Sequence, residues 1–147
     1  MPMNRIQFQT GLSLPAFMRS FGTEAQCEQA LMTARWPQGW HCPQCGHDRH
    51  YRLARSAHGL LQCLACRHQS SMTAGTLFDN TKLPLTTWFL AIYLISQAKT
   101  GLSSLALKRQ LGVSYPTAWL VHHKILAAMG QRDAQHRLDG AVQLDDA

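Results

Sequence analysis

The chain has 147 residues, a net charge of +6 at neutral pH and a sequence pI near 9.4. This length allows one ordinary domain or two very small ones, and small modules often need a metal because their core is thin. The longest apolar run, residues 88–95, has eight residues, far short of the roughly 20 that span a bilayer. The polar N-terminal segment also lacks the apolar run of a signal peptide. We therefore expect a cytoplasmic protein without a membrane partner.

The positive charge is unevenly distributed. Residues 42–83 carry five bases and two acids, and residues 84–129 carry four bases and no acid. Residues 130–147 reverse the sign, with two bases and four acids. An excess of bases is typical of proteins that bind nucleic acid, but a solvated surface has the same composition. Charge alone therefore leaves the question open, and the motifs must decide it.

The most informative motif consists of two Cys-x-x-Cys pairs, Cys42/Cys45 and Cys63/Cys66, separated by 17 residues. This spacing is typical of a zinc ribbon, in which two short turns bring four thiolates together around Zn²⁺. Four protein ligands leave no open coordination position for water or substrate. The motif therefore predicts a structural zinc site rather than a catalytic one.

Two other interpretations of these cysteines remain open. Disulfides or reactive thiols are possible, but no feature of the sequence indicates export to an oxidising compartment. Histidines crowd the same region, and any of them could replace a cysteine as ligand: His41, His47, His50, His58 and His68. The fifth cysteine, Cys27, shares a helical spacing with apolar residues, so we expect it in the core.

The elements before residue 84 follow from local signals. Thr23 and Gln26 form a capping box, which predicts a helix that ends near Ala34. Gly46 follows the first cysteine pair, where a positive φ brings backbone amides close to the sulfurs. Three short segments are predicted to form an antiparallel ribbon: residues 50–55, 60–63 and 69–73.

The segment after residue 84 predicts three helices. The first, capped by Thr86 or Thr87 and ending near Ala98, is apolar on nearly every side and is expected to be buried or shared. The second begins at Ser103 or Ser104 and ends at Leu111, and Gly112 then makes a tight turn. The third is capped by Ser114, with Pro116 in its first turn. This order is typical of a helix-turn-helix unit.

The third helix has two different sides. An apolar side contains Ala118, Val121, Ile125 and Ala128, and the polar side is left to meet a DNA groove. The candidate DNA-binding residues on this unit are Lys108, Arg109, Tyr115, Thr117, His123 and Lys124. The alternative is a helical packing unit that never contacts DNA, and Lys108 supports it because such units usually have a small residue at this point.

Together these patterns predict a small α+β fold, with a zinc-stabilised antiparallel β-ribbon between an N-terminal helix and a C-terminal helix-turn-helix unit. The expected parts are an N-terminal helical segment at residues 1–40, the zinc ribbon at 41–83 and the helix-turn-helix at 84–130. Residues 131–147 contain glycines and several acids, and most of this stretch reads as a linker.

Several short motifs in this order resemble the zinc-ribbon insertion-sequence transposases of the DDE type. The resemblance covers roughly residues 13–147. It is carried by Arg35-Trp36-Pro37-x-Gly39, Cys42-Pro43-x-Cys45-Gly46, Cys63-x-x-Cys66, Thr73-Ala74-Gly75-Thr76, Lys82-Leu83-Pro84-Leu85-x-x-Trp88 and Leu111-Gly112-Val113-Ser114-Tyr115-x-Thr117-Ala118-Trp119. Several independent motifs in one order are far more specific than any one of them.

The resemblance implies a nuclease domain of ribonuclease-H-like fold after the helix-turn-helix. Residues 142–146 match the first strand of that domain, which makes Asp145 the first catalytic carboxylate of an incomplete site. Two-metal catalysis needs several carboxylates around both ions, so Mg²⁺ would act only in a full-length relative. We therefore expect the non-catalytic, DNA-binding part of a truncated transposase, which recognises double-stranded transposon ends during DNA transposition and is associated with the nucleoid.

Two further functions stay open. A zinc-ribbon adapter would bind protein, including other copies of itself through residues 88–95, and a DNA-binding regulator would use the same helix-turn-helix. An independent enzyme is disfavoured because the acidic residues are few and are clustered at the C-terminus.

Overall fold

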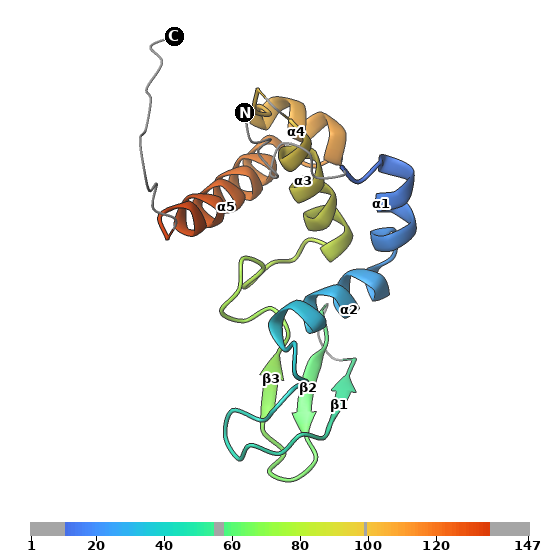
Figure 1. The fold of residues 1–147 in the computed structure, drawn as a ribbon, viewed down its shortest axis with the longest axis vertical. Coiled ribbons are helices and arrows are strands. Elements are labelled where there is room, and N and C mark those ends of the chain that lie inside the picture. The colour runs from blue at the N-terminus through green and yellow to red at the C-terminus, as the bar shows by residue number, and fades with distance from the viewer. Residues whose placement is uncertain (1–10, 55–57, 99, 136–147) are drawn as a thin grey trace, which may run out of the picture. The chain divides into compact units, whose positions relative to one another are not determined.

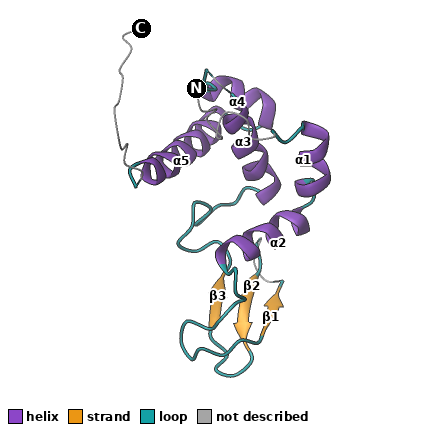
Figure 2. Ribbon diagram, in the orientation of Figure 1, coloured by secondary structure: helices purple, strands orange, loops and turns teal. Residues whose placement is uncertain are grey.

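A computed structural model describes residues 11–54, 58–98 and 100–135. The chain divides after Leu102 into two compact units, and each is described by itself. The first contains helices before and after a three-stranded sheet, which confirms the small α+β fold (Figures 1 and 2). The elements are α1 (Leu14–Phe21), α2 (Glu24–Arg35), β1 (His50–Leu53), β2 (Leu60–Cys63), β3 (Gln69–Ser71), α3 (Leu85–Gln97), α4 (Ser104–Leu111) and α5 (Tyr115–Asp133).

The two N-terminal helices begin at side-chain caps. The predicted capping box is confirmed on α2, where Thr23 Oγ1 accepts from the Gln26 N–H at 3.3 Å and Gln26 Oε1 accepts from the Thr23 N–H at 3.1 Å. Helix α1 is an addition to the single helix foreseen in this segment. Ser13 caps it, and a proline occupies its first turn, where a missing N–H costs nothing.

The sheet is antiparallel with the order β1-β2-β3. His50 pairs with Cys63, so β2 joins β1 over its whole length, and residues 60–62 of β2 pair with β3. Burial alternates along β2, with Leu61 and Cys63 turned inward. The three predicted strands are confirmed, although β1 and β3 end two residues earlier than expected.

The ribbon core includes two of the cysteines. Trp40, Cys42, Leu61, Cys63 and Met72 form one buried cluster, and Met32 and Trp36 pack against it. The last turn of α2 therefore covers the same core that holds two of the predicted zinc ligands. Cys27, also on α2, is fully buried as expected.

Arg35, the last residue of α2, binds the chain that leaves β3. Its Nη1 donates to the carbonyl oxygens of Ser71 at 2.9 Å and Met72 at 2.7 Å, and its Nη2 donates to that of Ala74 at 2.6 Å. The guanidinium also lies 4.7 Å from the centre of the Trp36 ring. A planar group with several fixed donors suits this arrangement, and a lysine would not reproduce it.

Helix α3 begins at Leu85, with Pro84 at its N-cap position, so the predicted caps at Thr86 or Thr87 are wrong. Glu24, the first residue of α2, caps it instead. Its Oε1 accepts from the Leu85 N–H at 2.7 Å, and its Oε2 accepts from the Thr86 N–H at 3.1 Å. A carboxylate at a helix N-terminus satisfies amides that have no partner within the helix, and it also complements the helix dipole.

Aromatic side chains hold α3 within the first unit. Phe17 stacks on Tyr93 with 4.5 Å between ring centres, and Phe21 lies 5.3 Å from Phe89. Trp88 is buried, and its indole N–H donates to Thr81 Oγ1 at 2.8 Å. These contacts fit the expectation that α3 is a buried or shared helix.

The second unit is a helical hairpin that follows the predicted pattern. Ser103 caps α4, Gly112 ends it with a φ of 67°, and Ser114 caps α5. The buried contacts are made by Leu107, Ala118, Val121 and Ile125. Ala128 was expected on the same face but is exposed, because α5 has 19 residues and extends past the eight of α4.

A hydrogen bond joins the two helices of this unit. His122 Nδ1 lies 2.9 Å from Ser104 Oγ. Burial lowers the pKa of His122, and the neighbouring His123 lowers it further. The folded unit therefore favours the neutral imidazole.

The cap provided by Glu24 is testable. Glu24→Ala removes both acceptors from the start of α3, so we expect a loss of about 1–3 kcal/mol in the free energy of unfolding. Glu28→Ala is the matched control, since it removes a carboxylate of the same helix that binds the half-exposed Arg52 at 2.7 Å. That ion pair should contribute about 1 kcal/mol or less. Equal losses in chemical denaturation would contradict the capping role.

The neutral His122 predicts a pH dependence. A histidine whose pKa is lower in the folded state stabilises the fold above its unfolded pKa, and the effect is lost as pH falls below about 6.5. Thermal unfolding of the wild type and of His122→Gln should therefore differ in pH dependence, with the wild type losing more stability between about pH 7.5 and about pH 5.5. Parallel curves for the two proteins would contradict this role for His122.

Candidate metal centre and nucleic-acid interface

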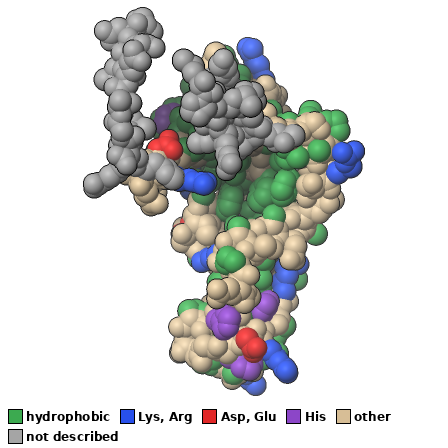
Figure 3. Space-filling model, in the orientation of Figure 1, with side chains coloured by type: hydrophobic (Ala, Val, Ile, Leu, Met, Phe, Trp, Pro, Cys, Tyr) green, Lys and Arg blue, Asp and Glu red, His purple; other side chains and the backbone are tan. Residues whose placement is uncertain are grey.

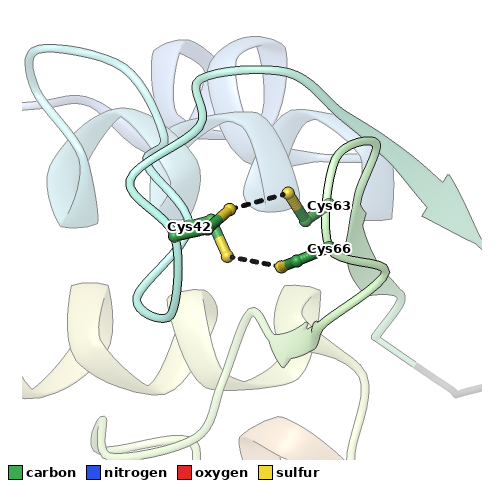
Figure 4. Close-up of side chains that lie close together, drawn as sticks. Cys42, Cys63 and Cys66 are labelled. Atoms are coloured by element: carbon green, nitrogen blue, oxygen red, sulfur yellow. Dashed lines mark hydrogen bonds between the residues drawn. The ribbon is translucent and has the colours of Figure 1, made fainter.

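The four predicted zinc ligands lie together. The sulfur atoms of Cys42, Cys45, Cys63 and Cys66 are all within 4.8 Å of one another. Cys42 Sγ is 3.5 Å from Cys66 Sγ, and Cys45 Sγ is 3.6 Å from Cys63 Sγ (Figure 4). Zn–S bonds of about 2.3 Å in a tetrahedron place sulfurs about 3.8 Å apart. The cluster is therefore consistent with a structural zinc site.

Each cysteine pair sits on a turn with the same hydrogen bonds. In the first, the Cys42 N–H donates to the His47 carbonyl at 2.9 Å, and the Gly46 N–H donates to the Cys42 carbonyl at 2.9 Å. In the second, the Cys63 N–H donates to His68 at 2.9 Å, and the Arg67 N–H donates to Cys63 at 3.1 Å. The two Cys-x-x-Cys-x-His segments therefore form two equivalent knuckles.

The residue after each cysteine pair adopts a left-handed backbone. Gly46 has a φ of 73°, as the sequence predicted, and no neighbour would meet a side chain there. The second knuckle has Arg67 at the equivalent place, with a φ of 61°. This left-handed conformation is strained for arginine but not for glycine, which has no Cβ. Sequence reasoning missed this position, although the repeated Cys-x-x-Cys-x-His pattern could have shown it.

The four thiols influence one another's ionisation. Burial would raise the pKa of Cys42, but backbone N–H groups of Cys45 and Gln44 and the adjacent sulfurs lower it to about 6. Burial likewise opposes ionisation of Cys63, and the backbone N–H groups of Cys66 and Ala65 lower its pKa. At Cys66 the His68 amide favours the thiolate, yet burial and three nearby sulfurs raise the pKa to about 12. Four thiolates at this spacing therefore require a cation.

The nearby histidines do not join the sulfur cluster. Within residues 11–54, 58–98 and 100–135, the four cysteines are the one group of three or more potential ligands that converge. His58 is buried, with Nε2 lying 3.2 Å from the Thr81 carbonyl oxygen. All five cysteines are free thiols. Both observations favour four thiolate ligands over histidine substitution or disulfides.

The predicted DNA-binding residues lie on the helical hairpin. Lys108 and Arg109 are in the last turn of α4, and Arg109 is exposed. Thr117 and Lys124 share one side of α5, because seven residues are close to two helical turns. His123 stacks on Trp119 with 3.9 Å between ring centres. Tyr115 is 48 % exposed at the first position of α5. Asp145 lies outside the described residues.

The zinc ribbon also carries exposed bases. Arg49 and Arg67 are exposed, and the Arg49 carbonyl accepts from the Leu64 N–H at 3.1 Å, which holds it beside the second knuckle. Histidine, lysine and arginine side chains gather over the ribbon in Figure 3, with an acidic side chain among them. In contrast, residues 88–95 contain no exposed side chain. Self-association through that segment stays a prediction.

The fold and the sulfur cluster define the class of this part of the chain as a zinc ribbon. Residues 22–69 match the family described as the transposase zinc-ribbon domain, of the IS1595 type. The chain is also similar to an uncharacterized protein in transposable element ISH50 of Halobacterium salinarum, with 27 % identity over 133 residues. That similarity covers 88 % of this chain and 43 % of the relative.

These comparisons support a coarser conclusion than the sequence motifs do. The chain contains a transposase zinc-ribbon domain and is distantly homologous to a protein of a transposable element. It spans less than half of that relative's length. No solved structure matches it. Among the described helices, none is long and apolar enough to cross a membrane.

The metal centre predicts that zinc and folding are coupled. The ribbon has a small core that contains two of the ligands, so metal binding should contribute directly to its folding free energy. The purified chain should bind about one zinc ion, and a chelator should abolish the ribbon's structure as measured by circular dichroism. Cys45→Ala should lose zinc.

Cys27→Ala is the control for this experiment, because it removes a buried thiol outside the cluster. This variant should keep its zinc even if its stability falls. Full zinc in Cys45→Ala, or a ribbon that stays folded without metal, would contradict the four-thiolate site.

Proposed function

We propose that this chain is the DNA-recognition part of a transposase and binds the duplex ends of its transposable element. The transposase zinc ribbon at residues 22–69 carries the proposal. It is followed by a helical hairpin whose described residues contain a single acid, Asp133. Base-rich helices placed after such a module are suited to duplex DNA, because neutralised phosphates supply most of the affinity.

The hairpin has the arrangement that groove recognition requires. A tight turn at Gly112 separates a short helix from a longer one, and Ser114 caps the start of the second. Base-reading side chains of such units come from the N-terminal part of the second helix. Thr117 and Lys124 lie on one side of that helix, and Lys108 and Arg109 lie in the last turn of the first helix. These residues support binding by residues 103–135.

A protein adapter is the second candidate, and one observation favours it. An open, mostly apolar groove of about 690 Å³ runs beside α1 and α2, lined by residues such as Phe21, Ala25 and Ala30. Apolar grooves of this kind accept side chains of a partner protein. Absence of DNA binding under low salt would favour this candidate.

DNA binding by the hairpin should depend steeply on salt. Neutralisation of about two to four phosphates would give a slope of about −2 to −4 in a plot of log affinity against log salt. Arg109→Gln together with Lys124→Gln should weaken binding and flatten that slope by up to about 2 units. Fluorescence anisotropy with a labelled transposon-end duplex measures both quantities.

The control is Arg19→Gln with Lys82→Gln, which makes the same change in net charge in the first unit. It should leave the slope nearly unchanged. Equal effects of the two double variants would show non-specific attraction, and an unchanged slope in the first would exclude the hairpin as the DNA surface.

A further inference from the structure

A row of exposed apolar side chains runs along α5. Tyr115, Trp119, Leu126 and Met129 are 48 %, 47 %, 44 % and 46 % exposed. Single exposed apolar residues are ordinary in a soluble protein, but several large ones on one side of a helix indicate a contact surface. The row therefore needs an explanation apart from the packing of α5 on α4.

The spacing of this row identifies the kind of contact. With His122 and Asp133, it occupies positions 115, 119, 122, 126, 129 and 133, which alternate steps of four and three residues. This 3.5-residue repeat is the pattern of a seam between two helices. The side of α5 that packs on α4 contains Ala118, Val121 and Ile125. Each of these precedes a seam residue by one position, so the two sides are rotated by about 100°.

Charges at the two ends of α5 select the partner and its direction. The first turn of α5 contains no acid, and Asp133 is its last residue. A helix dipole disfavours a carboxylate at its own C-terminus and favours one near a helix N-terminus. An antiparallel second copy would place Asp133 beside the first turn of its partner. A parallel copy would instead set Asp133 against the partner's Asp133.

The antiparallel register also matches the side chains in pairs. It sets Tyr115 opposite the partner's Asp133, where a phenol can donate to a carboxylate. It sets Trp119 opposite the partner's Met129, a favourable sulfur–aromatic contact. His122 meets the partner's Leu126, and the hydrogen bond to Ser104 occupies its Nδ1. The lowered pKa of His122 keeps it neutral, as an apolar seam requires.

We propose that two copies of this chain associate through an antiparallel pair of α5 helices along this row. A 19-residue helix spans about 28 Å. One helix pair is a small interface, so a dissociation constant on the order of 10 µM is expected. The association does not depend on DNA, because Lys124 lies on the other side of α5, about 200° from Leu126. In this arrangement Tyr115 contacts the second copy rather than DNA.

Sedimentation of the full zinc-loaded chain tests the association. The wild type should pass from monomer to dimer between about 1 and about 100 µM. Leu126→Glu should remain monomeric, because pairing would bury an unpaired charge. Leu120→Glu is the matched control: Leu120 is 50 % exposed on the same helix but lies off the seam. It should dimerise like the wild type.

A monomeric wild type across this range would overturn the proposal, as would equal behaviour of the two glutamate variants. Unchanged helix content by circular dichroism checks that each variant is folded.

Photo-crosslinking tests the direction and the occupant. A benzophenone amino acid in place of Trp119 should crosslink to residues near Met129 of a second chain. A crosslink near position 119 of the second chain would show parallel pairing and overturn the antiparallel arrangement. A crosslink within the same chain to residues 11–102 would show that the protein's own first unit covers the row, and it would overturn the proposal. Absence of any crosslink in a sample that sediments as a dimer would also overturn the proposed seam.

Discussion

The stability of the first unit depends on four thiols that lie within 4.8 Å of one another. Such a group is stable only when a cation balances the charge of its thiolates, and the opposed pKa changes of Cys42 and Cys66 express this conflict. Because Cys42 and Cys63 also belong to the ribbon's buried core, the metal site and the core cannot form independently. The short strands then gain a stability that their few apolar contacts would not supply.

Helix α2 connects the zinc ribbon to the rest of the unit through hydrogen bonds at its two ends. At its C-terminus, Arg35 donates to three carbonyl oxygens at the end of β3 and in the chain after it. At its N-terminus, Glu24 accepts from two amides of α3. Both contacts satisfy backbone polar groups, including the first amides of α3, which have no partner within the helix, so loss of either weakens pairing at a partly buried place. The zinc ribbon is thereby connected to α3 by a single rigid element.

The helical hairpin obeys a different principle. Its caps, its turn and its buried contacts all come from residues 103–125, so it can form from local interactions alone. Its outer surfaces have distinct chemistry: bases on one part, and on another a row of large apolar residues with a 3.5-residue repeat. The proposed DNA contact and the proposed contact with a second copy are compatible, because the two surfaces lie on different sides of α5.

The amino-acid sequence by itself determined the four-cysteine cluster, the three strands and most helix caps. These features depend on residues a few positions apart, as in the capping box of Thr23 and Gln26 and the serine caps of α4 and α5. Only the tertiary structure decided that α3 is capped by Glu24, which is 61 residues away. It also decided the left-handed backbone of Arg67 and the exposure of the row on α5. The physical reason is that the local sequence shows which backbone N–H and C=O groups need a hydrogen-bond partner. Long-range packing decides which side chain supplies it.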